Sequence, residues 1–458
     1  MTTTATRPTR KTGGASDPTT SGPIARVVLA SLATGVLGAL FGILLVVPGA
    51  REHTTTGVAL LAFAAGWAML AVLSARFTSQ PQRWARVPAA VMAATGLGLL
   101  FAAPGNDGLT RAGWVWPPAL LALAFWSVVQ LRHAMTSRRG RWLMYPLLAG
   151  MSLASVGGWA ETAALSHDHG ALMMPGERYD IGGRQLHMNC TGTGSPTVIL
   201  SNGTGEMSQN WARIIPQVAT TTRVCAYDRA GQGWSDDAPH PQDGIDIATD
   251  LHALLRAAGE HGPYVLAGHS LGGVYDMTYA STYPEDVAGM VLLDSSSPEQ
   301  FTALPDYPSA YSMMRRLYGT APSVARLGIG RLLSTSAYST LPQPAAGQVR
   351  AFGTSSRGLE NARDDVSRFH DAFKQAQALT TLGAKPLVVL TASGSITDTA
   401  GWSAAQDKLA TLSTNVAHVV TDASHEGVVG DERGAAASAN SIEMVVRAAR
   451  SGPAGELS

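Results

Sequence analysis

The sequence predicts two structural halves: an all-α transmembrane domain, followed by an α/β domain whose sheet is mainly parallel. Charged residues make up only 14% of the 458 residues, and the deficit is concentrated in the first third of the chain. From about residue 177, short apolar strand-like runs alternate with helix-like segments. This alternation is typical of a parallel sheet that is covered by helices on both faces.

The membrane half contains five apolar stretches, at about 25–48, 56–75, 87–104, 114–131 and 142–164. Each is close to the roughly 17–25 residues that a helix needs to cross the hydrocarbon core. We therefore expect a transmembrane domain of about five helices over residues 24–165. Before it, residues 1–23 are rich in Thr, Ser and Gly, and we expect them to form a disordered cytoplasmic tail.

Arginine residues predict the orientation, because cytoplasmic connections carry an excess of positive charge. The N-terminal tail and the second and fourth connections are basic, whereas the first and third connections each carry one arginine with an acidic residue nearby. This alternation fits a cytoplasmic N-terminus. With five spans, a linker at 166–176 and everything after it would lie outside the cytoplasm, and Glu161 would lie at the outer interface.

The most informative motif is Gly-His-Ser-Leu-Gly-Gly at 268–273, in which Ser270 is the third residue. It follows a strand-like apolar run at 264–267 and precedes a helix-like stretch, which is the arrangement of a nucleophile elbow. Such a turn holds the serine in strained dihedral angles, and small neighbours let the strand and the helix approach closely. We therefore expect Ser270 to be an activated nucleophile.

Four further motifs surround the elbow in a fixed order. They are Ser-Asn-Gly-Thr-Gly at 201–205, the segment 227–235 that begins Tyr-Asp-Arg, Val-Leu-Leu-Asp at 291–294, and Ala-Ser-His at 423–425. In order and spacing, residues 177 to 450 resemble the α/β-hydrolase fold family. The combination with a membrane half resembles the membrane-embedded α/β-hydrolases of actinobacteria.

The resemblance implies a catalytic triad and an oxyanion hole. His425 is the expected base. The acid is expected to be either Asp294, after the sixth strand, or Asp398, after the seventh, and only one of the two. The backbone N–H groups of Leu271 and Thr204 are expected to form the oxyanion hole. No metal ion or organic cofactor is implied.

The resemblance also divides the second half of the chain. It implies a hydrolase core at 177–297 and 384–452, interrupted by a helical cap insertion at 298–383. In the family's strand order the second strand lies beside the fourth and antiparallel to it, which would place Cys190 next to Cys225. We expect a disulfide bond between them, and such a bond persists outside the reducing cytosol.

We therefore expect a serine hydrolase anchored in the cell membrane that cleaves a carboxylic ester or related acyl substrate, small or lipid, at the extracytoplasmic face. The reaction would pass through an acyl-enzyme intermediate. The alternatives are an acyltransferase, a peptidase resembling proline iminopeptidases, and a non-catalytic membrane-tethered binding module. The formal net charge is zero, so nothing indicates a nucleic-acid partner.

Overall fold

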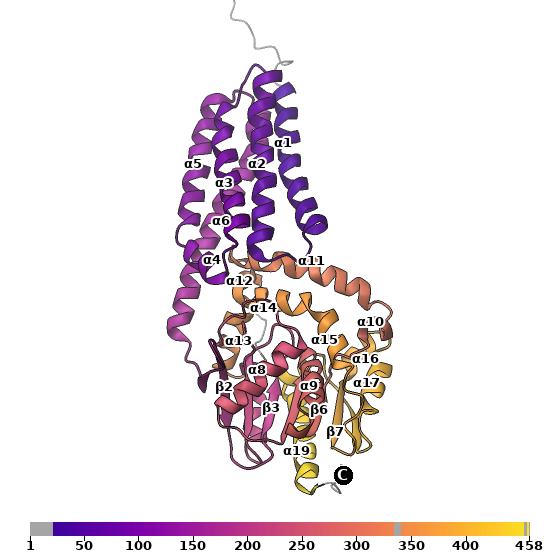
Figure 1. Cartoon of the computed structure of the whole chain (residues 1–458). Helices are drawn as coiled ribbons and strands as arrows, with labels where there is room; N and C mark the ends of the chain where they lie inside the picture. The colour runs from indigo at the N-terminus through magenta and orange to yellow at the C-terminus, as the bar shows by residue number, and fades with distance from the viewer. Residues whose placement is uncertain (1–21, 334–339, 453–455, 458) are drawn as a thin grey trace, which may run out of the picture.

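The computed structural model describes residues 22–333, 340–452 and 456–457, so the tail expected at 1–23 lies almost wholly outside the described residues. Figure 1 shows a bundle of long helices above an α/β domain, and α1 begins at the end of the bundle that is farthest from this domain. The expected order of the two halves, an all-α domain followed by an α/β-hydrolase sheet, is confirmed.

The bundle is built from α1 (Gly22–Phe41), η2 (Gly42–Val46), α2 (Glu52–Phe77), η3 (Arg83–Ala85), α3 (Arg86–Ala102), α4 (Asn106–Ala112), α5 (Trp116–Ala134) and α6 (Arg138–Ala171). Among the described residues, four helices are long and apolar enough to cross a membrane. The fourth expected span is instead a bent pair, α4 and α5 at 48°, which makes a fifth span only if the pair is counted as one.

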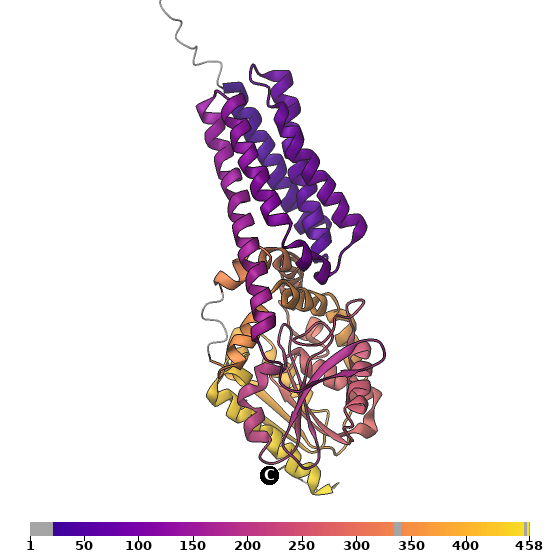
Figure 2. The same ribbon diagram turned by 90° about the vertical axis from the view of Figure 1, so that its left-hand side faces the viewer.

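Helix α6 extends beyond the bundle. It contains 34 residues, which corresponds to about 51 Å of helix, whereas the hydrocarbon core is about 30 Å thick. Figure 2 shows α6 continuing from the bundle towards the α/β domain. The expected apolar stretch ends at 164, but α6 continues past it. The linker expected at 166–176 is therefore helical as far as Ala171.

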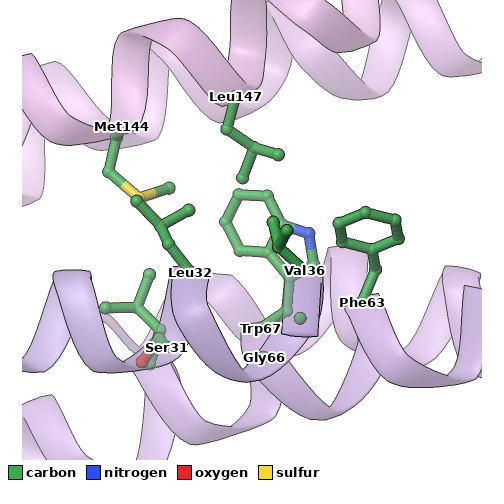
Figure 3. Close-up of a pocket in the computed structure, with 10 residues that line it drawn as sticks. Ser31, Leu32, Val36, Phe63, Gly66, Trp67, Met144 and Leu147 are labelled. Carbon is green, nitrogen blue, oxygen red and sulfur yellow. The ribbon is translucent and has the colours of Figure 1, made fainter. Parts of the chain in front are cut away.

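Close packing inside the bundle depends on small residues. A Cβ atom at Gly66 of α2 would lie 2.6 Å from the carbonyl oxygen of Ser31 in α1, so the two helices can cross here only at a glycine. Beside this crossing, Figure 3 shows Leu32, Trp67 and Met144 around a gap of about 20 Å³. A space of this size holds about one water molecule, so we interpret it as a packing gap.

The α/β domain contains an eight-stranded sheet with the order β1-β2-β4-β3-β5-β6-β7-β8. The strands from β3 to β8 are parallel, and β2 is antiparallel to both of its neighbours. The strands are β1 (Glu177–Asp180), β2 (Gln185–Thr191), β3 (Val198–Ser201), β4 (Val224–Tyr227), β5 (Tyr264–His269), β6 (Val287–Leu293), β7 (Leu387–Ala392) and β8 (Val416–Thr421).

Both faces of the sheet are buried, which explains the continuous apolar runs of the central strands. In β5, for example, Leu266 packs into the core on one face, whereas Val265 and Ala267 pack into the core on the other. The first face is covered by α8 (Gly244–Ala257), α9 (Leu271–Thr282) and α17 (Trp402–Ala410). The second is covered by η4 (Ser208–Arg213), α7 (Ile215–Val218), α18 (Gly427–Gly430) and α19 (Glu432–Arg450).

The expected disulfide bond is present. Cys190 of β2 and Cys225 of β4 face each other directly in the antiparallel register, and their sulfur atoms are bonded. The bond joins the antiparallel strand β2 to the parallel part of the sheet.

The segment expected to form the cap is helical where it is described. It contains α10 (Gln300–Ala303), α11 (Tyr307–Ala325), α12 (Ile329–Leu333), α13 (Ala345–Gly353), α14 (Ser356–Ser367) and α15 (Phe369–Ala376). Phe369 and Phe373 of α15 are buried in the core that covers the first face of the sheet. The cap therefore packs against the hydrolase core and contributes side chains to it (Figure 1).

Two ion pairs, each with a buried carboxylate, connect the cap to the bundle. Arg326, which follows α11, lies 2.9 Å from a carboxylate oxygen of Glu52 at the start of α2. Arg331 of α12 lies 3.0 Å from Glu161 of α6. The side chains of Glu52 and Glu161 are only 3% and 2% exposed. Glu161 therefore lies in a contact between the two halves.

Replacing Arg326 with Met tests this connection. The change leaves the Glu52 carboxylate buried without its partner, and breaking a buried pair in this way typically costs about 3–5 kcal/mol. We expect a clear decrease in the unfolding temperature of the purified protein in detergent. Arg433→Met is the control, because Arg433 and Asp422 form a pair that is 79% and 83% exposed. Equal unfolding temperatures for both variants would contradict the role of the buried pair.

Candidate active site

Ser270 lies in the sharp turn between β5 and α9, as the elbow motif predicts. Its φ of 53° and ψ of −119° are strained for a residue with a side chain. Gly272 makes the turn possible, because a Cβ atom there would lie 2.1 Å from the carbonyl oxygen of Ser201. The backbone N–H of Ser270 donates to the carbonyl oxygen of Leu293, which fixes the turn against β6.

The structure brings Ser270, His425 and Asp294 together in one chain of hydrogen bonds. Oγ of Ser270 lies 2.9 Å from Nε2 of His425, and Nδ1 of His425 lies 2.6 Å from Oδ2 of Asp294. The Asp294 side chain is fully buried and that of His425 is 32% exposed. In this geometry His425 can take the proton of the Ser270 hydroxyl while Asp294 accepts the Nδ1–H group.

Asp294 has a set of donors that suits a carboxylate. Its Oδ1 accepts hydrogen bonds from the backbone N–H of Ala392, at 3.0 Å, and from Nε1–H of Trp402, at 2.8 Å. The hydroxyl of Ser395 donates to Oδ2. Burial alone would raise the pKa of Asp294, but His425 and these donors outweigh burial and hold the pKa below its ordinary value.

The other candidate acid, Asp398, lies outside this chain of hydrogen bonds. It is the last residue of α16 (Ser393–Asp398), and it is exposed. Within the described part of the chain, Asp398 has no hydrogen bond or ion pair with His425. Helix α16 starts directly after β7, so its first turn, through Ser395, contacts Asp294, whereas its last residue faces solvent.

The two expected oxyanion donors flank Ser270. Leu271 is the first residue of α9, where a backbone N–H has no acceptor within the helix. On the other side, a Cβ atom at Gly203 would lie 3.1 Å from Cβ of Ser270, so the loop that continues into Thr204 passes directly over the serine. Two backbone N–H groups in this position can stabilise an oxyanion.

Arg229 contacts the same loop, residues 202–204, which is called the oxyanion loop below. Its guanidinium group donates to the backbone carbonyl oxygen of Asn202 at 2.6 Å and forms an ion pair with Asp365 of α14 at 2.9 Å. The Arg229 and Asp365 side chains are only 2% and 7% exposed. Arg229 therefore connects the oxyanion loop to the cap.

Glu206 and His269 form a pair that no sequence motif predicts. Nδ1 of His269 lies 2.8 Å from Oε1 of Glu206, and Nε2 lies 3.0 Å from the backbone carbonyl oxygen of His425. A histidine directly before the expected nucleophile was the available signal. The sequence alone does not connect it to a glutamate 63 positions earlier.

A second buried carboxyl group, that of Asp276, lies in α9 beneath the elbow. The Ser201 hydroxyl donates to it at 2.6 Å, and its other oxygen has no hydrogen-bond partner in the described structure. Burial raises the pKa of Asp276 from 3.8 to about 8. The carboxyl group is therefore protonated at neutral pH.

Replacing Asp276 with Asn tests this protonation. The folded protein holds the proton more tightly than the unfolded chain does, so this group stabilises the fold fully below about pH 4, and the stabilisation is lost as the pH rises towards about 8. Asparagine does not titrate. We expect the melting temperature of Asp276→Asn, relative to the natural protein, to rise between about pH 5 and pH 8.5. A constant difference over that range would contradict the protonated state.

Comparison with known proteins supports the assignment of the fold. The family model for the alpha/beta hydrolase fold matches residues 196–347. An uncharacterized protein of Schizosaccharomyces pombe is 26% identical over 308 residues, which cover 58% of this chain and 55% of that protein. An uncharacterized vacuolar membrane protein of Saccharomyces cerevisiae is 29% identical over 129 residues, which cover 24% of this chain and 20% of that protein.

Among solved structures, a thermophilic esterase from Thermogutta terrifontis is 23% identical, with a TM-score of 0.44. The alignment covers 57% of this chain and 94% of the esterase. The chain spans about half or less of the curated relatives named above. The narrower resemblance to actinobacterial membrane-embedded enzymes stays a prediction. The family match falls inside the eight-stranded domain, and this domain has the α/β-hydrolase fold.

Proposed function

We propose that this protein is a membrane-anchored serine hydrolase that cleaves a carboxylic ester or a related acyl substrate. The observation that carries the proposal is the unbroken chain of hydrogen bonds from Ser270 through His425 to the buried Asp294. A serine alone is a weak nucleophile, and an adjacent base that is itself oriented by a carboxylate is the arrangement that activates it.

In the proposed reaction, His425 takes the hydroxyl proton as Ser270 attacks the acyl carbonyl carbon. The backbone N–H groups of Leu271 and Thr204 stabilise the negative charge that develops on the carbonyl oxygen. His425 then gives the proton to the leaving alcohol, which leaves an acyl group on Ser270. A water molecule, activated by His425, releases the acid and restores the serine.

A fluorophosphonate probe tests the proposal directly, because it phosphonylates an activated serine. We expect the natural protein to be labelled and Ser270→Ala to be unlabelled. A folded natural protein that remains unlabelled would overturn the proposal and favour a non-catalytic, membrane-tethered binding module. If labelling occurs, product analysis with added alcohols separates hydrolysis from acyl transfer, and amino-terminal proline peptides test the peptidase alternative.

Asparagine variants of the two candidate acids identify the residue that orients His425. We expect Asp294→Asn to lower kcat/KM for a short-chain ester by about 10³–10⁴-fold, because asparagine cannot hold the required histidine tautomer or stabilise the imidazolium. Asp398→Asn is the matched control and should change kcat/KM by no more than about twofold, because its exposed side chain lies outside the network. The reverse result would exclude Asp294 as the orienting acid.

We also propose that the hydrolase domain faces away from the cytoplasm. The disulfide bond between Cys190 and Cys225 supports this orientation, because such bonds seldom persist in the cytosol. The arginine-rich connections support it independently. With five crossings, they would lie at the end of the bundle opposite the hydrolase domain, which is the cytoplasmic end by the positive-inside rule.

Single-cysteine labelling in intact cells measures this orientation. Both natural cysteines are joined in the disulfide bond, so an introduced cysteine provides the reactive thiol. We expect a membrane-impermeant maleimide to label Ser451→Cys, near the end of the hydrolase domain, but not Ser79→Cys in the connection after α2. Both positions are exposed. Labelling of Ser79→Cys alone would place the hydrolase domain in the cytoplasm.

A further inference from the structure

One side-chain pair joins three separate segments of the site. Glu206 lies in the loop after β3, His269 ends β5, and His425 lies in the loop after β8. One carboxylate oxygen of Glu206 accepts from the backbone N–H of Gly203 at 2.5 Å, and the other lies 2.8 Å from Nδ1 of His269. Nε2 of His269 completes the path at 3.0 Å from the carbonyl oxygen of His425.

The partners of His269 determine where its protons lie. A backbone carbonyl oxygen can only accept, so Nε2 carries hydrogen. Nδ1 faces Glu206, which also accepts from Gly203 and is therefore suited to be a carboxylate. Burial opposes charge on both groups, but their mutual attraction outweighs burial, so the pKa of Glu206 is lowered and that of His269 is raised. Both shifts favour the charged forms, and in the imidazolium form His269 donates from both nitrogens.

We propose that Glu206 and His269 are positioning residues that hold the oxyanion loop and the backbone of His425 in register around Ser270. The proposal rests on the proposed hydrolase function. Glu206 fixes Gly203, which precedes the expected oxyanion donor Thr204, and His269 fixes the main chain that carries the expected base. Neither residue is assigned a contact with the reacting atoms.

Packing alone does not explain this pair. The side chains of His269 and Glu206 are only 2% and 12% exposed, and apolar residues of similar size would fill the same space without the cost of desolvating two charges. The carboxylates of Glu206 and Asp294 act on His269, and the backbone carbonyl oxygen of His425 accepts its hydrogen bond. Its ring centre lies 4.8 Å from that of His425. A small displacement of this pair would therefore shift the oxyanion loop and His425 relative to Ser270.

Three substitutions of His269 separate its two contacts. His269→Gln keeps an amide N–H near the position of Nε2, so it can still donate to the His425 carbonyl oxygen. His269→Asn keeps a donor near the position of Nδ1, towards Glu206, and loses the contact with His425. His269→Leu loses both contacts and fills a similar space with an apolar side chain.

We expect His269→Leu to lower kcat for a short-chain ester about 100-fold, since a displacement of about 1 Å in such a site can cost that factor. His269→Gln should recover most of this loss, and His269→Asn should not. KM should stay within about threefold in all three variants, because the pair does not contact the substrate. A general loss of stability would not make kcat of His269→Gln higher than that of His269→Asn.

His187→Gln is the matched control. His187 is also a buried histidine between a carboxylate and a backbone carbonyl, with Nδ1 at 2.8 Å from Asp228 and Nε2 against Pro175, but it lies outside the site. We expect this variant to lose stability and to keep kcat within about twofold. The unfolding temperature of every variant is measured alongside its kinetics.

The outcomes separate the two proposals. If the natural protein is not labelled by the fluorophosphonate probe, the hydrolase function fails and the positioning role fails with it. If the natural protein is labelled and His269→Leu keeps its kcat, only the positioning role is overturned. If His269→Leu does not fold, the comparison of Gln with Asn decides, and equal kcat values for these two variants would overturn the role.

Discussion

The buried Asp294 carboxylate accepts hydrogen bonds from the end of β7, at Ala392, from Trp402 of α17 and from His425 in the loop after β8. Asp294 itself follows β6, so one charge gathers three successive parts of the chain at the same edge of the sheet. A buried carboxylate is costly unless its oxygens are satisfied. The arrangement that orients His425 is therefore also the arrangement that the fold requires there.

Compensated buried charges recur around Ser270. Arg229 and Asp365 lie beneath the oxyanion loop, and Glu206 and His269 lie beside it. Arg229, Glu206 and His269 each make directional contacts with backbone atoms as well as with a charged partner. Fixed dipoles and ions of this kind need little reorganisation when charge develops during a reaction, which is the main way in which such sites stabilise an oxyanion.

Features that depend on local pattern could be predicted from the sequence. The alternation of apolar runs with helix-like segments predicted the mainly parallel sheet, and the glycines around Ser270 predicted the strained turn. The choice between Asp294 and Asp398 could not be made, because it depends on how α16 turns after β7. Likewise, the contacts of His269 with Glu206 and of Glu161 with Arg331 join residues far apart in sequence, so no periodicity or motif indicates them.

The ion pairs between cap and bundle have a practical consequence for anyone who wishes to produce the catalytic half by itself. A protein cut near residue 177 would lose Glu52 and Glu161, so Arg326 and Arg331 would each lack a carboxylate that normally shields them. Other contacts between the halves, such as the hydrogen bond from the Thr55 hydroxyl to the carbonyl oxygen of Gly319, would also be lost. The two halves are thus connected by specific contacts, and assays of the hydrolase domain belong with the whole chain.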